Sequence, residues 1–259
     1  IVRLKDMRLI VISNRLPITL AEKGGGLVYQ ESAGGLVSGI SAYLDSLKST
    51  KKQELEYVWA GWPGMSVSEE LQDGVRKKLN SEYHAHPVFL PEKAMDKFYH
   101  GFCNKTVWPL FHCFTANIIW DEEYWEQYRT VNEKFCEALC QILQPDDIIW
   151  VHDYHLMLLP ELLRKRSLGN PIGFFLHIPF PSFEIYRLLP RKWSRGILEG
   201  ILGANLVGFH TNDYTQYFLR SVQRILGYEH KMGQLIAGEQ IVRVETFPMG
   251  IDFQRFHTT

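Results

Sequence analysis

The sequence predicts an α/β protein built on a Rossmann-like, doubly wound and mostly parallel β-sheet. Apolar runs at 148–152 and 172–178 show no alternation of polar and apolar residues, which is typical of strands buried on both faces of a parallel sheet. Amphipathic stretches at helical period lie between most of the apolar runs. Strands that alternate with helices along a chain indicate a sheet of this kind.

The elements follow from these two periodicities. Expected strands are Arg8–Ser13, Tyr57–Ala60, Pro87–Leu90, Asp147–His152, Ile172–Ile178, Asn205–His210 and Ile241–Phe247. Expected helices are Leu36–Leu47, Leu71–Leu79, Tyr124–Leu143, Leu156–Arg166, Trp193–Leu202 and Tyr214–Leu226. The glycine-rich segment Ala21–Ser32 predicts a hairpin or a flexible flap. Since no repeat or linker divides the rest, residues 1–259 are expected to form one domain.

Composition limits the classes of function. The chain has 259 residues, 46% of them apolar, and a formal net charge of −1, so nothing favours a nucleic-acid partner. Neither a signal peptide nor a run of about twenty apolar residues is evident, which predicts no membrane contact and a cytoplasmic location. The cysteines form no C-x-x-C pair and are expected to be buried free thiols: Cys103, Cys113, Cys136 and Cys140.

Polar residues follow two of the predicted strands directly. Asp153 comes after the run that ends at His152, and His177 lies at the end of the run that begins at Ile172. Parallel sheets bind ligands in the crevice beyond their carboxyl ends. A carboxylate there accepts hydrogen bonds from sugar hydroxyls, and an imidazole with a near-neutral pKa suits a site where charge develops. The pattern therefore favours a sugar or nucleotide site.

The N-terminal segment offers groups for an anion. Arg15 ends the first predicted strand, and its guanidinium suits a phosphate or a carboxylate, although a surface ion pair is the commoner role of such an arginine. Gly34 and Gly35 open a predicted helix, where backbone N–H groups and the helix dipole favour a phosphate. They form neither a G-x-G-x-x-G nor a Walker A motif, and a plain tight turn is an equal alternative.

Aromatic residues near strand ends suit a sugar ring. Trp62 follows a predicted strand, while Tyr99 and Trp108 follow a helix-like segment. Flat aromatic faces stack on sugar rings, and a tyrosine hydroxyl adds a polar contact, but core packing is the commoner role of any one aromatic. The tryptophans away from strand ends are expected to be core residues: Trp120, Trp125 and Trp150.

Two other kinds of site fit poorly. His152 and His155 have the i, i+3 spacing of metal ligands, yet no third ligand with sensible spacing follows, so no metal is expected. A serine hydrolase is disfavoured because the chain has no G-x-S-x-G motif and Ser13 precedes an Asn-Arg turn.

Several motifs together resemble those of one enzyme family. They are Ser13-Asn-Arg-Leu-Pro, Ser32-Ala-Gly-Gly-Leu, Trp59-Ala-Gly-Trp-Pro-Gly, Phe98-Tyr99 with Trp108-Pro, Asp147-Ile-Ile-Trp-Val-His-Asp-Tyr-His-Leu, Arg164-Lys-Arg, Ile172-Gly-Phe-Phe-Leu-His-Ile-Pro-Phe-Pro and Phe247-Pro-Met-Gly-Ile. In this order they resemble the trehalose-6-phosphate synthases, glycosyltransferase family 20. The resemblance implies a GT-B enzyme that transfers glucose from UDP-glucose to glucose 6-phosphate with retention, and it needs no cofactor. This chain is similar only to the N-terminal, acceptor-side domain, and its start at Ile1 and its stop after Phe247-Pro-Met-Gly-Ile are expected to mark a piece of a longer protein.

The resemblance also implies a role for each motif residue. Glucose 6-phosphate would contact Arg15 and Tyr99 through its phosphate and Asp153 through its hydroxyls. Trp108 and Ile178 would shape an anomer-selective wall, and Trp62 would border the same pocket. On the donor side, Gly34 and Gly35 would meet UDP-glucose, and His177 would contact its sugar near the scissile bond. The family's donor-phosphate and uridine contacts would lie beyond residue 259.

Two alternatives remain open beside this enzyme. One is a non-catalytic synthase-like domain that serves as a scaffold or regulatory subunit, which the presence of motif residues for both substrates disfavours. The other is a related synthase with a different phosphorylated acceptor. A fused phosphatase domain, a homo-oligomer or a trehalose-synthesis complex would also be compatible with the resemblance.

Overall fold

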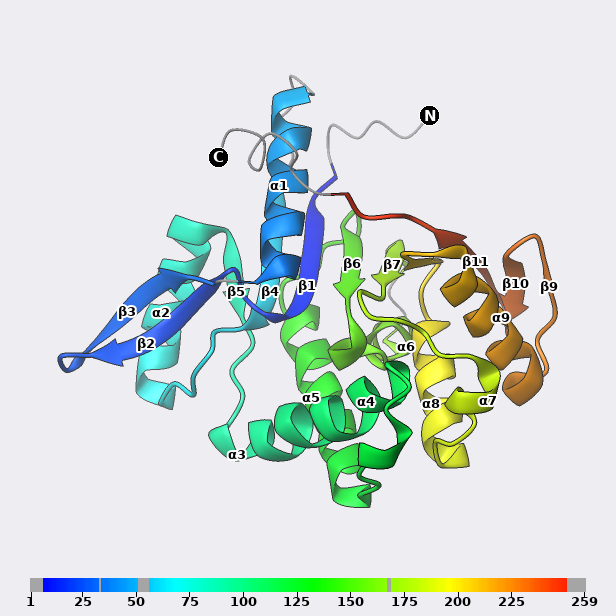
Figure 1. Cartoon of the computed structure of the whole chain (residues 1–259). Helices are drawn as coiled ribbons and strands as arrows, with labels where there is room; N and C mark the ends of the chain where they lie inside the picture. The colour runs from blue at the N-terminus through cyan, green and yellow to red at the C-terminus, as the bar shows by residue number, and fades with distance from the viewer. Residues whose placement is uncertain (1–6, 33, 51–55, 167–168, 251–259) are drawn as a thin grey trace, which may run out of the picture.

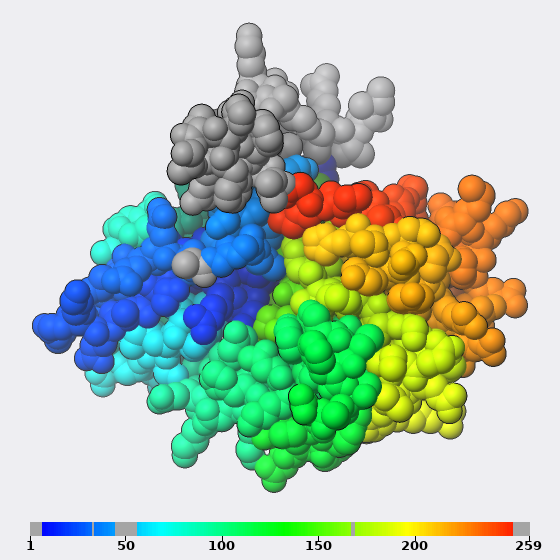
Figure 2. All heavy atoms as spheres, viewed as in Figure 1, coloured from blue at the N-terminus to red at the C-terminus, as the bar shows by residue number. Residues whose placement is uncertain are grey.

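A nine-stranded sheet organises the chain, with strands in the order β5-β4-β1-β6-β7-β8-β11-β10-β9 (Figure 1). The computed structural model describes residues 7–32, 34–50, 56–166 and 169–250. The first seven strands in this order, from β5 to β11, pair in parallel. The last two, β10 and β9, extend the sheet in antiparallel register. A separate two-stranded hairpin, β2–β3, projects from the body (Figures 1 and 2).

The elements have the following bounds. The strands are β1 Leu9–Arg15, β2 Ile18–Lys23, β3 Gly26–Glu31, β4 Tyr57–Trp62, β5 Ala85–Pro87, β6 Ile148–His152, β7 Ile172–Phe175, β8 Leu206–Phe209, β9 His230–Lys231, β10 Gln234–Ala237 and β11 Gln240–Thr246. The α-helices are α1 Gly35–Thr50, α2 Glu69–Tyr83, α3 Glu92–Met95, α4 Trp108–Phe111, α5 Glu122–Cys140, α6 Leu159–Lys165, α7 Phe183–Tyr186, α8 Arg191–Ile201 and α9 Asn212–Leu226. A π-helix spans Asp96–Val107, and short 3-10 helices span Thr115–Asn117 and Tyr154–Leu156.

Apolar residues on both faces of the sheet account for the doubly wound arrangement. In β1, Ile10 and Ile12 belong to the larger hydrophobic core, while Val11 belongs to the smaller one. Because successive side chains of a strand point to opposite faces, the two cores lie on opposite sides of the sheet. Helices α5, α6, α8 and α9 contribute to the larger core, and α1 and α2 to the smaller. The predicted α/β fold with a mostly parallel sheet is confirmed.

Three predictions from the sequence are wrong in detail. The strand expected at Pro87–Leu90 is Ala85–Pro87, because β5 pairs with β4 through Ala85 to Pro87. Trp120 is 44% exposed and is no core residue, because it lies in the segment between the Thr115–Asn117 turn and α5, where its ring centre is 6.2 Å from that of Trp193. Cys113 and Cys140 are exposed, unlike Cys103 and Cys136. Cys140 shares the helix face of Cys136, and it is exposed because it is the last residue of α5.

Close backbone packing fixes the position of α8. A Cβ on Gly200 would lie 2.4 Å from the Met157 carbonyl oxygen and 2.7 Å from the Leu158 Cα. A contact of this length with backbone forces the helix to move. Glycine at position 200 therefore lets α8 approach the start of α6 closely.

We expect Gly200→Ala to destabilise the protein by about 1–3 kcal/mol, because the added methyl overpacks a backbone contact. The matched control is Gly74→Ala in α2, where an added Cβ meets nothing within 4 Å. That exchange should be neutral or stabilising by about 0.5–1 kcal/mol through helix propensity. Chemical denaturation of both variants measures the difference, and equal stability of the two would contradict the packing account.

Candidate active site

A bulge at the end of β1 places Arg15 beside Trp62. The β1–β4 register shifts between Ile12 and Arg15, after which Arg15 pairs with Trp62. The Arg15 guanidinium carbon lies 5.0 Å from the centre of the Trp62 ring, within the range of a cation–π contact. Trp62 itself is buried, whereas Arg15 is exposed. The guanidinium charge of Arg15 is therefore presented at the carboxyl edge of the sheet.

Three residues hold this bulge in shape. The Ser13 hydroxyl donates to the Arg15 carbonyl at 2.7 Å, and the Trp59 indole N–H donates to the Ser13 oxygen at 2.8 Å. On β4, a Cβ at Gly61 would come within 2.8 Å of the Ser13 carbonyl oxygen. Glycine is thus needed where the two strands approach most closely. Sequence reasoning missed these supporting roles, although the residues lie within motifs that it singled out.

The π-helix brings Tyr99 to the same place. The Arg15 guanidinium carbon lies 5.7 Å from the Tyr99 ring centre, and Tyr99 stacks on His155 with centroids 5.6 Å apart and planes 10° apart. The neighbouring Phe98 is fully buried in the larger core. A π-helix has a wider turn than an α-helix and is often found at functional sites. Here it directs Phe98 into the core and Tyr99 toward Arg15.

Asp153 follows β6 in an unusual backbone conformation. Its φ of 73° is positive, a backbone conformation that residues other than glycine rarely adopt. Backbone strain of this kind clusters at functional sites. The Asp153 N–H donates to the Phe175 carbonyl at 2.8 Å, and its Oδ1 accepts from the His177 N–H at 3.3 Å. Burial raises the pKa of the Asp153 carboxyl to about 7, against the opposing effect of the backbone N–H groups of Tyr154 and His177.

His155 joins Asp153 to Tyr99. Its Nδ1 lies 3.8 Å from Asp153 Oδ2, and both side chains are largely buried. Burial, followed by the nearby charge of Arg15, lowers the pKa of His155 to about 3. The imidazole is therefore neutral, and the contact with Asp153 is no ion pair at neutral pH. Sequence reasoning weighed His155 only as a metal ligand, although its place two residues after Asp153 is a usable signal.

Histidines gather at the ends of the next strands. His152 Nδ1 and His177 Nε2 are 2.9 Å apart, and the His177 and His210 rings have centroids 5.6 Å apart. Burial, followed by the proximity of His210, lowers the pKa of His177 to about 4. His177 is consequently neutral and suited to hydrogen bonding with a ligand. In the described part of the chain, no group of three or more His, Cys, Asp or Glu side chains is placed to hold a metal ion.

The remaining site residues predicted from the sequence are not joined to this cluster by a hydrogen bond or a ring contact among the described residues. Gly34 precedes α1 and Gly35 begins it, and an added Cβ at either would meet nothing within 4 Å. Gly35 has no positive φ, so its backbone conformation does not itself require glycine. Trp108 is 39% exposed and stacks on His112, with centroids 4.1 Å apart. Ile178 packs against the larger core. Among the described residues, no hydrogen bond or ring contact links these four to Arg15 or Asp153.

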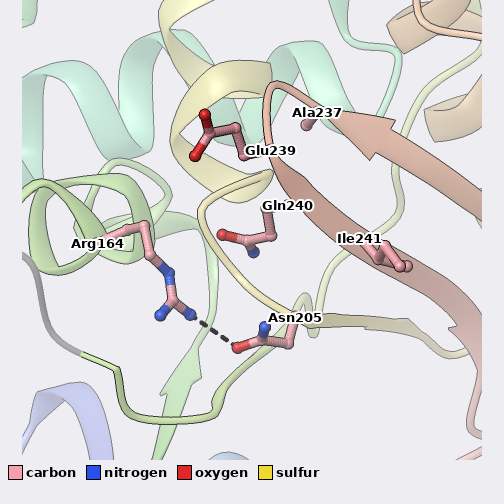
Figure 3. A pocket seen from close by; sticks show the side chains of 6 residues that line it. All are labelled: Arg164, Asn205, Ala237, Glu239, Gln240 and Ile241. Atoms are coloured by element: carbon pink, nitrogen blue, oxygen red, sulfur yellow. Dashed lines mark hydrogen bonds between the residues drawn. The ribbon is translucent and has the colours of Figure 1, made fainter.

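A hollow lies at the opposite, amino-terminal edge of the parallel strands, between α6 and the β10–β11 turn (Figure 3). Arg164 donates to Asn205 Oδ1 at 2.7 Å, and the same oxygen accepts from the Ile172 N–H. Gln240 donates to the Ala204 carbonyl at 2.7 Å. These bonds tie the starts of β7, β8 and β11 together, which makes the hollow a structural junction.

The described part of the chain contains no helix long and apolar enough to cross a membrane.

Comparison with protein families identifies the architecture around this cluster. Residues 7–259 match the model described as glycosyltransferase family 20. The chain belongs to glycosyltransferase family 20. It is 45% identical over 254 residues to the bifunctional trehalose-6-phosphate synthase/phosphatase of Thermoproteus tenax, covering 98% of this chain and 34% of that protein.

Solved structures of this family have the same fold. A trehalose-6-phosphate protein from E. coli bound with UDP-2-fluoro glucose superposes with a TM-score of 0.78 at 30% identity, covering 97% of this chain and 50% of that one. A UDP-forming α,α-trehalose-phosphate synthase from Burkholderia xenovorans in complex with glucose-6-phosphate gives 0.75 at 29% identity, covering 94% and 50%. This family 20 chain spans half or less of the length of these relatives.

The raised pKa of Asp153 predicts a pH-dependent stability. Since its folded pKa of about 7 exceeds the value of 3.8 in an exposed chain, folding favours the protonated form. This contribution is therefore lost as the pH rises from about 4 through 7. Between pH 5 and pH 8, the melting temperature should fall more in the unaltered protein than in Asp153→Asn, which cannot ionise. Identical falls in both proteins would show that the carboxyl titrates normally.

Proposed function

We propose that the chain is the N-terminal, acceptor-side domain of a GT-B α,α-trehalose-phosphate synthase (UDP-forming). The full protein would transfer glucose from UDP-glucose to glucose 6-phosphate with retention. The observation that carries the proposal is the cluster of Arg15, Trp62, Tyr99, His155 and Asp153 at the carboxyl edge of a family 20 sheet. A cytoplasmic location would suit these phosphorylated substrates, and the second domain would supply the remaining donor contacts.

The acceptor suits the charges in this cluster. Arg15 presents a cation beside the Tyr99 ring, which together fit a phosphate and the adjacent sugar carbon atoms. Asp153 lies beyond them and supplies oxygens for sugar hydroxyls. Hydroxyls of the acceptor sugar would donate hydrogen bonds to the carboxylate in place of those it loses to burial. These hydrogen bonds would favour its charged form. Trp62 would border this pocket, and Trp108 with Ile178 would select the anomer.

The donor would lie across the same edge. His177 follows β7, next to Asp153, and would bond the sugar near the scissile bond. Gly34 and Gly35 would let the donor approach the backbone N–H groups at the start of α1. The open space around both glycines supports such an approach, because no side chain of the described residues fills it.

The chemistry we propose uses position and charge in place of an enzymic nucleophile. The acceptor hydroxyl would attack on the face from which UDP leaves, and the departing phosphate would take its proton. Asp153 would orient the acceptor, Arg15 would hold its phosphate, and His177 would steady the donor sugar. Orientation and preorganised charge are large terms in such a transfer.

Incubation of the full-length protein with UDP-glucose and a panel of phosphorylated acceptors tests the proposal. We expect UDP release with glucose 6-phosphate and a non-reducing disaccharide phosphate as product, whereas residues 1–259 alone should show no turnover. Product with another acceptor only would favour a related synthase. Binding without turnover of any acceptor would favour a scaffold or regulatory domain.

Arg15→Ala should raise the KM for glucose 6-phosphate roughly ten- to a hundredfold, since a charge-assisted hydrogen bond to phosphate contributes about 1.5–3 kcal/mol. The KM for UDP-glucose should stay within about twofold, because the lost charge faces the acceptor. Arg76→Ala is the matched control, as Arg76 pairs with Asp73 on the distant helix α2. Steady-state kinetics with each substrate varied in turn measures both KM values. An unaltered KM for glucose 6-phosphate would show that Arg15 does not contact the acceptor.

Gly35→Ala should lower turnover strongly and leave the melting temperature nearly unchanged. The new Cβ has open space in this structure, so its cost would arise only when the donor approaches the start of α1. Gly74→Ala, another exchange into open space on a helix, should leave turnover unaltered. Both quantities should be measured on one preparation of the full-length protein. Full turnover in Gly35→Ala would contradict a donor contact at this glycine.

A further inference from the structure

His152 forms a buried pair with His177. It is the last residue of β6, its side chain is fully buried, and its Nδ1 lies 2.9 Å from His177 Nε2. Its ring also packs against Trp150, with centroids 4.3 Å apart. Burial lowers the pKa of both histidines below the ordinary value, so both rings are neutral near neutral pH. Each ring therefore carries one proton, and one nitrogen of the pair must donate to the other.

The second nitrogen of His152 decides between the two arrangements. His152 Nε2 is buried and has no hydrogen-bond partner among the described residues. If His177 donated to His152, the only proton of His152 would lie on this Nε2 and form a buried N–H without an acceptor. If His152 donates, Nε2 is only a bare lone pair. Orphaned buried N–H groups are rarer than unsatisfied acceptors, so the second arrangement is favoured. The hydrogen-bonding network thus assigns the proton of His152 to Nδ1.

We propose that His152 is a positioning residue that donates its Nδ1–H to His177 Nε2 and so holds the proton of His177 on Nδ1. In the described residues, no hydrogen bond engages His177 Nδ1, and the side chain is only half-buried. This N–H is thus free to donate to a ligand oxygen at the carboxyl edge. The consequence for catalysis rests on the proposed function: a hydroxyl or phosphate oxygen of a nucleotide sugar would meet a donor of fixed direction.

The tautomer is measured directly by nitrogen NMR of the full-length protein labelled with ¹⁵N-histidine, with the His177 signals assigned by their loss in His177→Gln. We expect a protonated Nδ1 and a bare Nε2 on His177. In His152→Phe, which keeps a ring against Trp150 but has no donor, the two tautomers of His177 should mix. In His152→Asn, the amide N–H takes the place of Nδ1–H and should restore the original tautomer.

Kinetics adds a readout that packing alone would not move. His152→Phe should lower kcat/KM for UDP-glucose about three- to tenfold, the range for one neutral hydrogen bond, while the acceptor KM stays within twofold. His152→Asn should recover most of the loss. A bare Nδ1 on His177 in the unaltered protein, or equal losses in both variants, would overturn the proposal. The NMR result does not depend on turnover, so absence of transferase activity would count against the proposed function alone.

Discussion

The bulge that ends β1 is the constraint on which the acceptor side of the site depends. A regular strand would continue the β1–β4 register, but the shift after Ile12 sets Arg15 opposite Trp62. Ser13 and Trp59 tie the bulge from one side, and Gly61 leaves room for it on the other. Bulges commonly re-aim a side chain next to an active site. Here one irregularity converts a buried strand into a support for an exposed cation.

Burial then sets the charge state of the groups around that cation. His155 and His177 are neutral because desolvation lowers their pKa to about 3 and about 4, and the same effect raises the pKa of Asp153 to about 7. Arg15 is therefore the cation beside two neutral imidazoles. A phosphate would meet a single fixed cation, and sugar hydroxyls would meet neutral donors and acceptors beside it. This separation explains how one edge of the sheet could recognise both parts of a sugar phosphate.

The sequence predicted the sheet better than it predicted the site. Long apolar runs identified β1, β6, β7 and β8 because a strand buried on both faces leaves a composition signal. The π-helix that presents Tyr99 left no such signal, since its period differs from that of an α-helix by a fraction of a residue per turn. Motif residues marked Arg15, Tyr99 and Asp153, and the structure brings them together through His155. The buried histidines acquired their roles only from contacts between strands far apart in sequence, which periodicity does not encode.

Asp153 is a lone carboxyl at this edge among the described residues of the cluster. Retaining glycosidases use two carboxyl groups about 5–5.5 Å apart, one as nucleophile and one as acid. In the described part of the chain, Asp153 is the one carboxylate in contact with the cluster, and it is engaged by the His177 N–H and lies beside His155. A second carboxylate close by would push the pKa of Asp153 higher still and weaken its hold on hydroxyls. The described residues of this cluster therefore do not by themselves supply the carboxyl pair that a retaining glycosidase uses.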